Sequence, residues 1–172
     1  MITNWEIKGL SDSERYFLYA DSYLHASRSL TLRMREDETE RTWPLASVAL
    51  MLAAHSVELF LKGALISRAP DLLAGIKGPD RHRIDILAEA YFRAFPEDDF
   101  AFAVPFQSEY PDITDEEIAN LKKEEPVPSI LYRYPIESPG KEWPGLQGFE
   151  PQGFLEMLVE LRESYERIRG RI

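Results

Sequence analysis

A chain of 172 residues of which 44% are hydrophobic is long enough to bury one core and too short to favour two, so we expect one domain. Its formal net charge of −10 argues against broad non-specific binding to nucleic-acid backbones, which depends on lysine and arginine replacing counterions. The absence of cysteine excludes disulfides and thiolate metal sites. No basic region followed by an apolar run opens the sequence, and we expect a cytoplasmic protein.

The negative charge is concentrated in one segment. Residues 97–125 contain ten acidic residues and two lysines, and therefore carry −8 of the net charge of −10. The remainder of the chain is nearly neutral, with twenty acidic and eighteen basic residues. A local basic surface is therefore compatible with an acidic protein.

Hydrophobic periodicity predicts two long helices in the first half of the chain. Apolar and small residues recur every three or four positions over Ser11–Arg35, as in an amphipathic helix. The next helix, expected over Pro44–Ser67, begins at a proline, whose missing N–H would be unpaired in a first turn anyway. Small and apolar residues surround this second helix. We expect it to be the most buried helix, with Leu52, Leu59 and Phe60 in the core.

The second half of the chain is less regular. Asp80 can cap a third helix over Arg81–Ala94. Residues 97–113 alternate aromatic, acidic and proline residues, and their aromatic content favours an ordered loop over a linker. The sequence TDEE is a capping box that opens a short helix over Asp115–Lys123, and a last amphipathic helix begins at about Pro151.

These elements predict an all-α fold. We expect an up-and-down bundle of four to five helices with a long irregular insertion, about residues 97–150, before the C-terminal helix. Short connections would make the first three helices antiparallel neighbours. The second helix is apolar, but it contains a histidine, a glutamate and a lysine, so we interpret it as a buried central helix and expect no membrane association.

The second helix carries a polar stripe of His55, Glu58 and Lys62, at positions i, i+3 and i+7. Glu58 and Lys62 have the favourable order for an ion pair one helical turn apart. Two interpretations remain open. The stripe is either a solvated seam or internal ion pair of the bundle, or a polar groove with a function.

The three histidines fall on three different predicted helices. The sequences HSVE and HRID place a carboxylate one turn after His55 and His82, as metal sites in helical bundles do. His25 and His55 could lie at one height. His82, however, opens the third helix and should lie level with the end of the second, about 15 Å from His55. We therefore expect no metal and no cofactor, with a site of two histidines and Glu58 as the alternative.

Basic residues cluster around the predicted turn between the second and third helices. Lys62, Arg68, Lys77, Arg81, His82 and Arg83 lie there against two acids, Asp71 and Asp80. The unpaired N–H groups at a helix start add positive potential, so this end can hold an anion. The candidate ligand-binding residues are Lys62, Arg81, His82, Arg83 and Arg133. The alternative is a solvated turn, since GIKGPDRHR is not a phosphate-binding loop.

Several stretches share a pattern with a known superfamily. In LASVALMLAAHSVELFLKGALI, small and apolar residues surround Glu58 and Lys62. The stretch RHRIDILAEAYF follows with a His-x-x-Asp helix start, and YRYP precedes a final amphipathic helix. The pattern resembles the HEPN superfamily, helical-bundle domains found with nucleotidyltransferases and in prokaryotic defence and toxin–antitoxin loci. The resemblance covers about residues 14–92 and 154–170 and the YRYP piece.

The resemblance implies a homodimerising bundle with a nucleotide- or RNA-facing groove, and a nucleotidyltransferase or toxin–antitoxin protein as partner. Ribonuclease members carry an arginine followed after four to six residues by a histidine. Here Arg68 precedes His82 by fourteen positions, Arg81 adjoins it, and the arginines before His55 lie too far away. The motif is missing, and the insertion also departs from the compact members. Nuclease activity is therefore not implied.

Three hypotheses of function follow. The leading one is a non-catalytic, homodimeric HEPN-like module that binds a nucleotide-like ligand or a protein partner. The second is a metal-independent ribonuclease in which His82 is the acid or base, and Arg81, Arg83 or Arg133 neutralises charge; it requires His82 and an arginine to face one cleft. The third is an antitoxin-like protein that places the acidic segment 97–125 on a basic partner.

Overall fold

The computed structural model describes residues 1–107, 114–143 and 147–172, and these residues form an all-α fold, as predicted. The helices are α1 (Asp12–Glu36), α2 (Trp43–Arg68), α3 (Pro70–Gly75), α4 (Ile84–Ala94), α5 (Asp115–Glu124), α6 (Pro128–Leu131) and α7 (Pro151–Arg169). Short 3-10 helices lie at η1 (Asn4–Ile7), η2 (Glu38–Glu40), η3 (Gly78–His82) and η4 (Asp98–Phe100). The described residues contain no strand, only an isolated bridge between Ser138 and Lys141.

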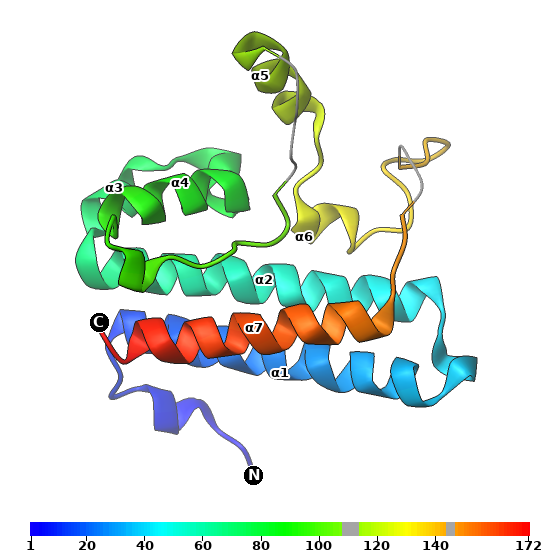
Figure 1. Ribbon diagram of the computed structural model, residues 1–172, viewed down its shortest axis with the longest axis horizontal. Coiled ribbons are helices and arrows are strands. Elements are labelled where there is room, and N and C mark those ends of the chain that lie inside the picture. Colours follow the sequence, from blue (N-terminus) through cyan, green and yellow to red (C-terminus); the bar gives the residue numbers. More distant parts are fainter. Residues whose placement is uncertain (108–113, 144–146) are drawn as a thin grey trace.

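Helices α1 and α2 form an antiparallel pair (Figure 1). Small residues allow their backbones to approach closely. The Ser27 hydroxyl donates to the carbonyl of Ala49 at 2.7 Å, and the Ser56 hydroxyl donates to the carbonyl of Ala20 at the same distance. These bonds satisfy buried hydroxyl groups and fix the register of the two helices.

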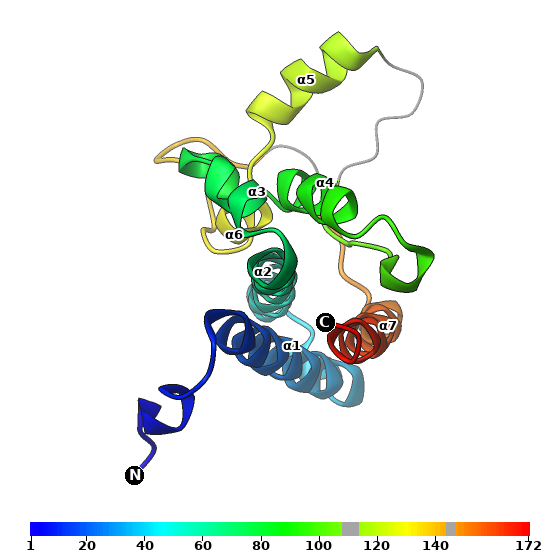
Figure 2. The ribbon, with the colours of Figure 1, turned by 90° about the vertical axis from the view of Figure 1, so that its left-hand side faces the viewer.

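Helix α2 lies in the middle of the molecule, between α1, α4, α6 and α7 (Figure 2). It contains more buried residues than any other described helix, which confirms its predicted place. Phe60 is fully buried and its ring stacks on Tyr165 of α7 at 3.8 Å between centroids. Leu52 and Leu59 are only partly buried, although Leu59 still packs against the main core cluster, so their predicted burial holds only in part. They fall on the less covered face of α2.

Among the described helices, α2 alone is long and apolar enough to cross a membrane by length and composition. Over the most apolar 18-residue stretch of α2, 56% is buried inside the protein. The same helix carries a buried glutamate and a buried lysine, which are paired with each other.

The predicted up-and-down path does not hold for α4. His82, just before α4, lies beside Glu58 in the middle of α2, whereas Phe95, just after α4, packs under Arg68 at the end of α2. Helix α4 therefore runs in the same direction as α2. The reversal is made by α3 and η3, which carry the chain back along α2 before α4 begins.

The start of α4 was also predicted incorrectly. Asp80 does not cap a helix from Arg81, because residues Gly78–His82 form the separate helix η3. The N-cap of α4 is Arg83, which makes no side-chain capping hydrogen bond. The missed helices α3 and α6 each begin at a proline and are only six and four residues long.

The described part of the predicted ordered loop covers the core. Phe100, Phe102 and Phe106 pack against the main hydrophobic cluster, and the Tyr91 hydroxyl donates to the carbonyl of Phe100 at 2.8 Å. Residues 108–113 of this predicted loop lie outside the described residues. The capping box that opens α5 at Thr114 is present as predicted.

Candidate functional site

The polar stripe of α2 is built around a buried ion pair. Glu58 is 3% exposed and Lys62 is 7% exposed. The Lys62 Nζ donates to the Glu58 Oε1 at 2.7 Å, one helical turn away. A charge buried this deeply is stable only when it is paired, and here each side chain compensates the other.

Glu58 keeps its negative charge in spite of its burial. Burial alone would raise the pKa of the carboxyl, because it disfavours the charged form. The side chains of His55 and Lys62 act in the opposite direction and prevail, so the pKa of Glu58 falls to about 2. At neutral pH, Glu58 is therefore a fixed carboxylate that accepts hydrogen bonds.

Two imidazoles approach this carboxylate. His82 Nδ1 lies 3.0 Å from Glu58 Oε1, within hydrogen-bonding distance, while 59% of the His82 side chain stays exposed. His55 Nδ1 lies 3.7 Å from Glu58 Oε2, and its ring packs edge to face with that of Tyr23 at 4.6 Å between centroids. Because an ionised carboxylate only accepts, it selects the His82 form that carries a proton on Nδ1. The other ring nitrogen, Nε2, is then free to act on a ligand.

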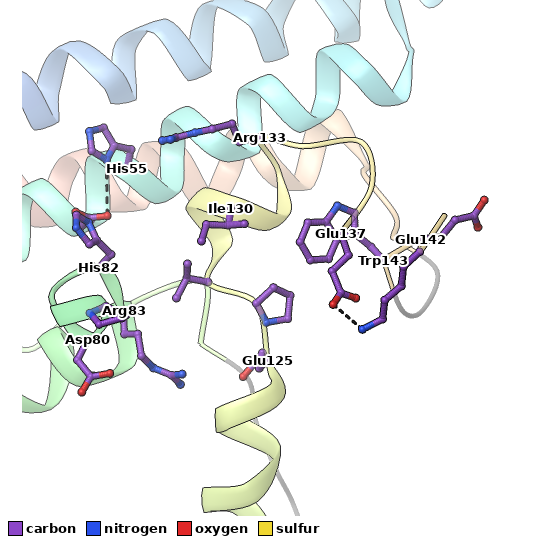
Figure 3. Close-up of a pocket in the computed structure, with 15 residues that line it drawn as sticks. His55, Asp80, His82, Arg83, Glu125, Ile130, Arg133, Glu137, Glu142 and Trp143 are labelled. Atoms are coloured by element: carbon purple, nitrogen blue, oxygen red, sulfur yellow. Dashed lines mark hydrogen bonds and ion pairs between the residues drawn. The ribbon is translucent and has the colours of Figure 1, made fainter. Parts of the chain in front are cut away.

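A pocket of about 1370 Å³ opens over these side chains. One side is formed by α2 and η3, with His55, Glu58 and His82, and the other by residues 125–143 (Figure 3). Ile130 and Trp143 supply apolar surface on this second side. Part of the insertion, which contains the predicted ligand-binding residue Arg133, therefore forms one wall of the pocket.

Arg133 faces the two histidines across the pocket. Its side chain extends toward His55 in Figure 3. Within the described residues, no hydrogen bond or ion pair occupies its guanidinium group. An arginine whose guanidinium has no partner among the described residues, on the same pocket as a histidine held by a carboxylate, is a suitable arrangement for a bound anion.

Acidic residues also line the pocket. Glu137 is ion-paired with Lys141 at 2.5 Å. Asp80, Glu125 and Glu142 lie away from the end at which His55 and Arg133 face one another (Figure 3). Glu58 is the carboxylate at that end, and Lys62 balances its charge.

The other predicted ligand-binding residues have different positions. Arg83 lines the pocket, but its guanidinium pairs with Asp85 and donates to the carbonyl of Lys122 at 2.6 Å. Its guanidinium is therefore engaged within the chain, and its role in binding a ligand stays a prediction. Arg81 is exposed and does not line this pocket, and Lys62 lies behind Glu58. Of the predicted arginines, only Arg133 faces the pocket without a partner among the residues that the structure describes.

The predicted separation of His55 and His82 is wrong. Both imidazoles approach Glu58, because α4 returns along α2 and does not start at its far end. In the described part of the chain, no group of three or more histidine, aspartate or glutamate side chains has the arrangement of a metal site. The absence of a metal stays a prediction for elemental analysis of the purified protein.

Comparison with known proteins gives no relative. No family model matches the chain, and neither does any curated protein or solved structure. The resemblance to the HEPN superfamily therefore stays an expectation, and the function is argued from the chemistry of the pocket.

Proposed function

We propose that the pocket binds the phosphate group of a nucleotide-like ligand, and that the protein is a helical binding module. The observation that carries this proposal is the convergence of His82 and the unpaired Arg133 on one pocket, above a buried carboxylate whose charge Lys62 balances. Arginine provides a planar fork of N–H donors that matches phosphate oxygens. A protonated His82 or His55 would add a second donor to the same anion.

Calorimetric titration in low salt tests the proposal, with AMP as the ligand. We expect binding with a 1:1 stoichiometry that weakens as salt is added, because partly exposed charges supply the attraction. Replacing Arg133 by Ala should weaken binding by about tenfold or more, because a charge-assisted hydrogen bond to phosphate is lost. Replacing His82 by Ala should weaken it in the same direction.

Arg81 provides the matched control. It is an arginine adjacent to His82, yet it does not line the pocket, so Arg81→Ala should leave the affinity for AMP unchanged. If Arg81→Ala and Arg133→Ala weaken binding equally, the attraction is general and the pocket is not the site. An absence of heat with AMP in low salt would overturn the proposal.

The Glu58–His82 pair favours a second candidate function, phosphodiester cleavage. A carboxylate that holds Nδ1–H of a histidine leaves Nε2 as a general base. In RNA, Nε2 would take the proton of a 2′-hydroxyl group while its oxygen attacks the adjacent phosphorus. The bond from phosphorus to the 5′ oxygen would break to leave a 2′,3′-cyclic phosphate, and the leaving 5′ oxygen would take up a proton from water. Arg133 would stabilise the added negative charge on the phosphate.

One comparison separates the two functions. A short single-stranded RNA is incubated with the protein beside the same sequence in DNA, which lacks the 2′-hydroxyl group. Cleavage of the RNA alone, lost in His82→Ala, would show the catalytic function. An RNA that is bound and recovered intact would leave the protein as a binding module. We expect the RNA to be recovered intact, because the chain lacks the arginine–histidine spacing of the ribonuclease members of the HEPN superfamily.

The acidic segment 97–125 bears on the binding of a protein partner. The acidic segment 97–125 was a candidate surface for a basic partner, but Glu97 is paired with Arg68 and Asp99 with Arg171. These carboxylates are therefore engaged within the chain. Binding to a nucleotidyltransferase or a toxin–antitoxin protein stays an expectation from the resemblance.

A further inference from the structure

A second hollow continues the pocket along the N-terminal end of α2. It has a volume of about 510 Å³ and lies between the first turns of α2 and residues 131–136. Arg133, Glu142 and Trp143 line both the pocket and this hollow, so the two are neighbours with a shared wall. We call it the aromatic groove. The residues that define its walls are Trp43, Pro44, Val48, Tyr132, Tyr134 and Trp143.

A hydrogen bond orders one wall of the aromatic groove. The Trp143 Nε1 donates to the carbonyl of Tyr134 at 2.7 Å, which joins the two sides of the loop that carries Arg133. Trp43 is 43% exposed and Tyr134 is 52% exposed. Exposed aromatic rings at the edge of a phosphate-binding pocket are the surface on which a flat ring can stack.

Two polar side chains accompany the rings. Ser47 and Gln147 line the aromatic groove, and neither makes a side-chain hydrogen bond within the part of the chain that the structure describes. A hydroxyl and an amide can each donate and accept, so they suit the mixed donors and acceptors on the edge of a nucleobase. A mostly apolar site with a few convergent polar groups is the usual composition of a small-molecule site.

We propose that the aromatic groove holds the base of the nucleotide whose phosphate lies at His82 and Arg133. The inference rests on the proposed function. The proposed function does not say which kind of phosphate compound binds. The pocket selects for phosphate, and the aromatic groove adds a selection for an aromatic base. Arg133 lies between the phosphate site and the base site, because it lines both hollows. The preferred ligands are then nucleotides, not sugar phosphates or inorganic phosphate.

Affinities for AMP and for ribose 5-phosphate, which lacks the base, test this assignment. The wild-type protein should bind AMP about tenfold or more tightly than ribose 5-phosphate, because only AMP stacks on the rings. Trp43→Ala should abolish this preference and leave the affinity for ribose 5-phosphate unchanged. Trp5→Ala is the matched control, since Trp5 is exposed in η1 and belongs to neither hollow.

Fluorescence gives a direct readout of the base. The chain has three tryptophans, and two of them, Trp43 and Trp143, line the aromatic groove. In a Trp5→Phe background, AMP should therefore quench the remaining emission by stacking, whereas ribose 5-phosphate should not. Changes of equal size with both ligands would contradict stacking.

The outcomes distinguish the inference from the function on which it rests. Equal affinity for AMP and ribose 5-phosphate would overturn the base site and leave the phosphate site intact. Failure of both ligands to bind would overturn the two together. If Trp43→Ala dissociated a dimer and left the preference for AMP unchanged, the aromatic groove would be an interface between two copies of the chain, and the inference would be wrong.

Discussion

Glu58 stabilises the fold through its charge. Its pKa is about 2 in the folded protein, against an ordinary value of 4.5. Because the folded-state pKa is the lower one, the stabilisation is complete above about pH 4.5 and is lost as the pH falls toward 2. We expect Glu58 to account for a fall of roughly 3 kcal/mol in the free energy of unfolding across this range. Denaturant unfolding followed by circular dichroism at several pH values measures this fall.

Glu58→Gln should remove this fall in the free energy of unfolding at acid pH. At neutral pH it should also lower the free energy of unfolding by roughly 3 kcal/mol, because Lys62 would stay buried without a counter-charge. Glu163→Gln is the control, since it removes an exposed carboxylate from α7. Equal losses in the two variants would show that Glu58 contributes no more than a surface charge.

The sequence predicted the residues of the site better than their arrangement. The spacing of Glu58 and Lys62 was enough to predict their ion pair, because one helical turn separates them. The contact of His82 with Glu58 spans 24 residues and depends on the path of the chain through α3 and η3. Periodicity carries no information on such a path. Nothing in the sequence indicated that Trp143 lines the pocket either, because Trp143 lies in an irregular segment without periodicity.

Helix α2 packs closely against α1 at Gly63. A Cβ atom placed there would lie 3.0 Å from ring atoms of Phe17 and 3.1 Å from Tyr16 Cβ. Gly63→Ala should therefore lower the free energy of unfolding by about 1 kcal/mol, since the overpacking cost exceeds the gain in helix propensity. Gly75→Ala, in α3, meets no atom within 4 Å and should be neutral or stabilising. Thermal unfolding of both variants checks this, and a stabilised Gly63→Ala would contradict close packing.

The long helices were predictable because each has a strong local signal. The apolar stripe of α1, the proline near the start of α2 and the apolar stripe of α7 all predicted their helices within a few residues. The direction of α4 was not predictable in the same way. It is decided by the packing of residues 69–83, which form two short helices with little periodicity of their own.

At the scale of the whole molecule, we expect a homodimer. Large apolar side chains remain exposed on several helices, including Leu18 and Tyr19 on α1 and Val159 on α7. Light scattering coupled to size exclusion should give about twice the chain mass of 19.9 kDa at micromolar concentration. A mass of one chain across that concentration range would contradict the prediction.

The buried carboxylate, the histidine it holds and the pocket above them form one unit, and NMR of the imidazole nitrogens tests that unit most directly. The chain has three histidines, and exposed His25 on α1 serves as an internal control. We predict that neutral His82 carries its proton on Nδ1, and that AMP shifts the resonances of His82 while those of His25 stay in place. A His82 protonated on Nε2, with no response to AMP, would contradict both the hydrogen bond to Glu58 and the phosphate site.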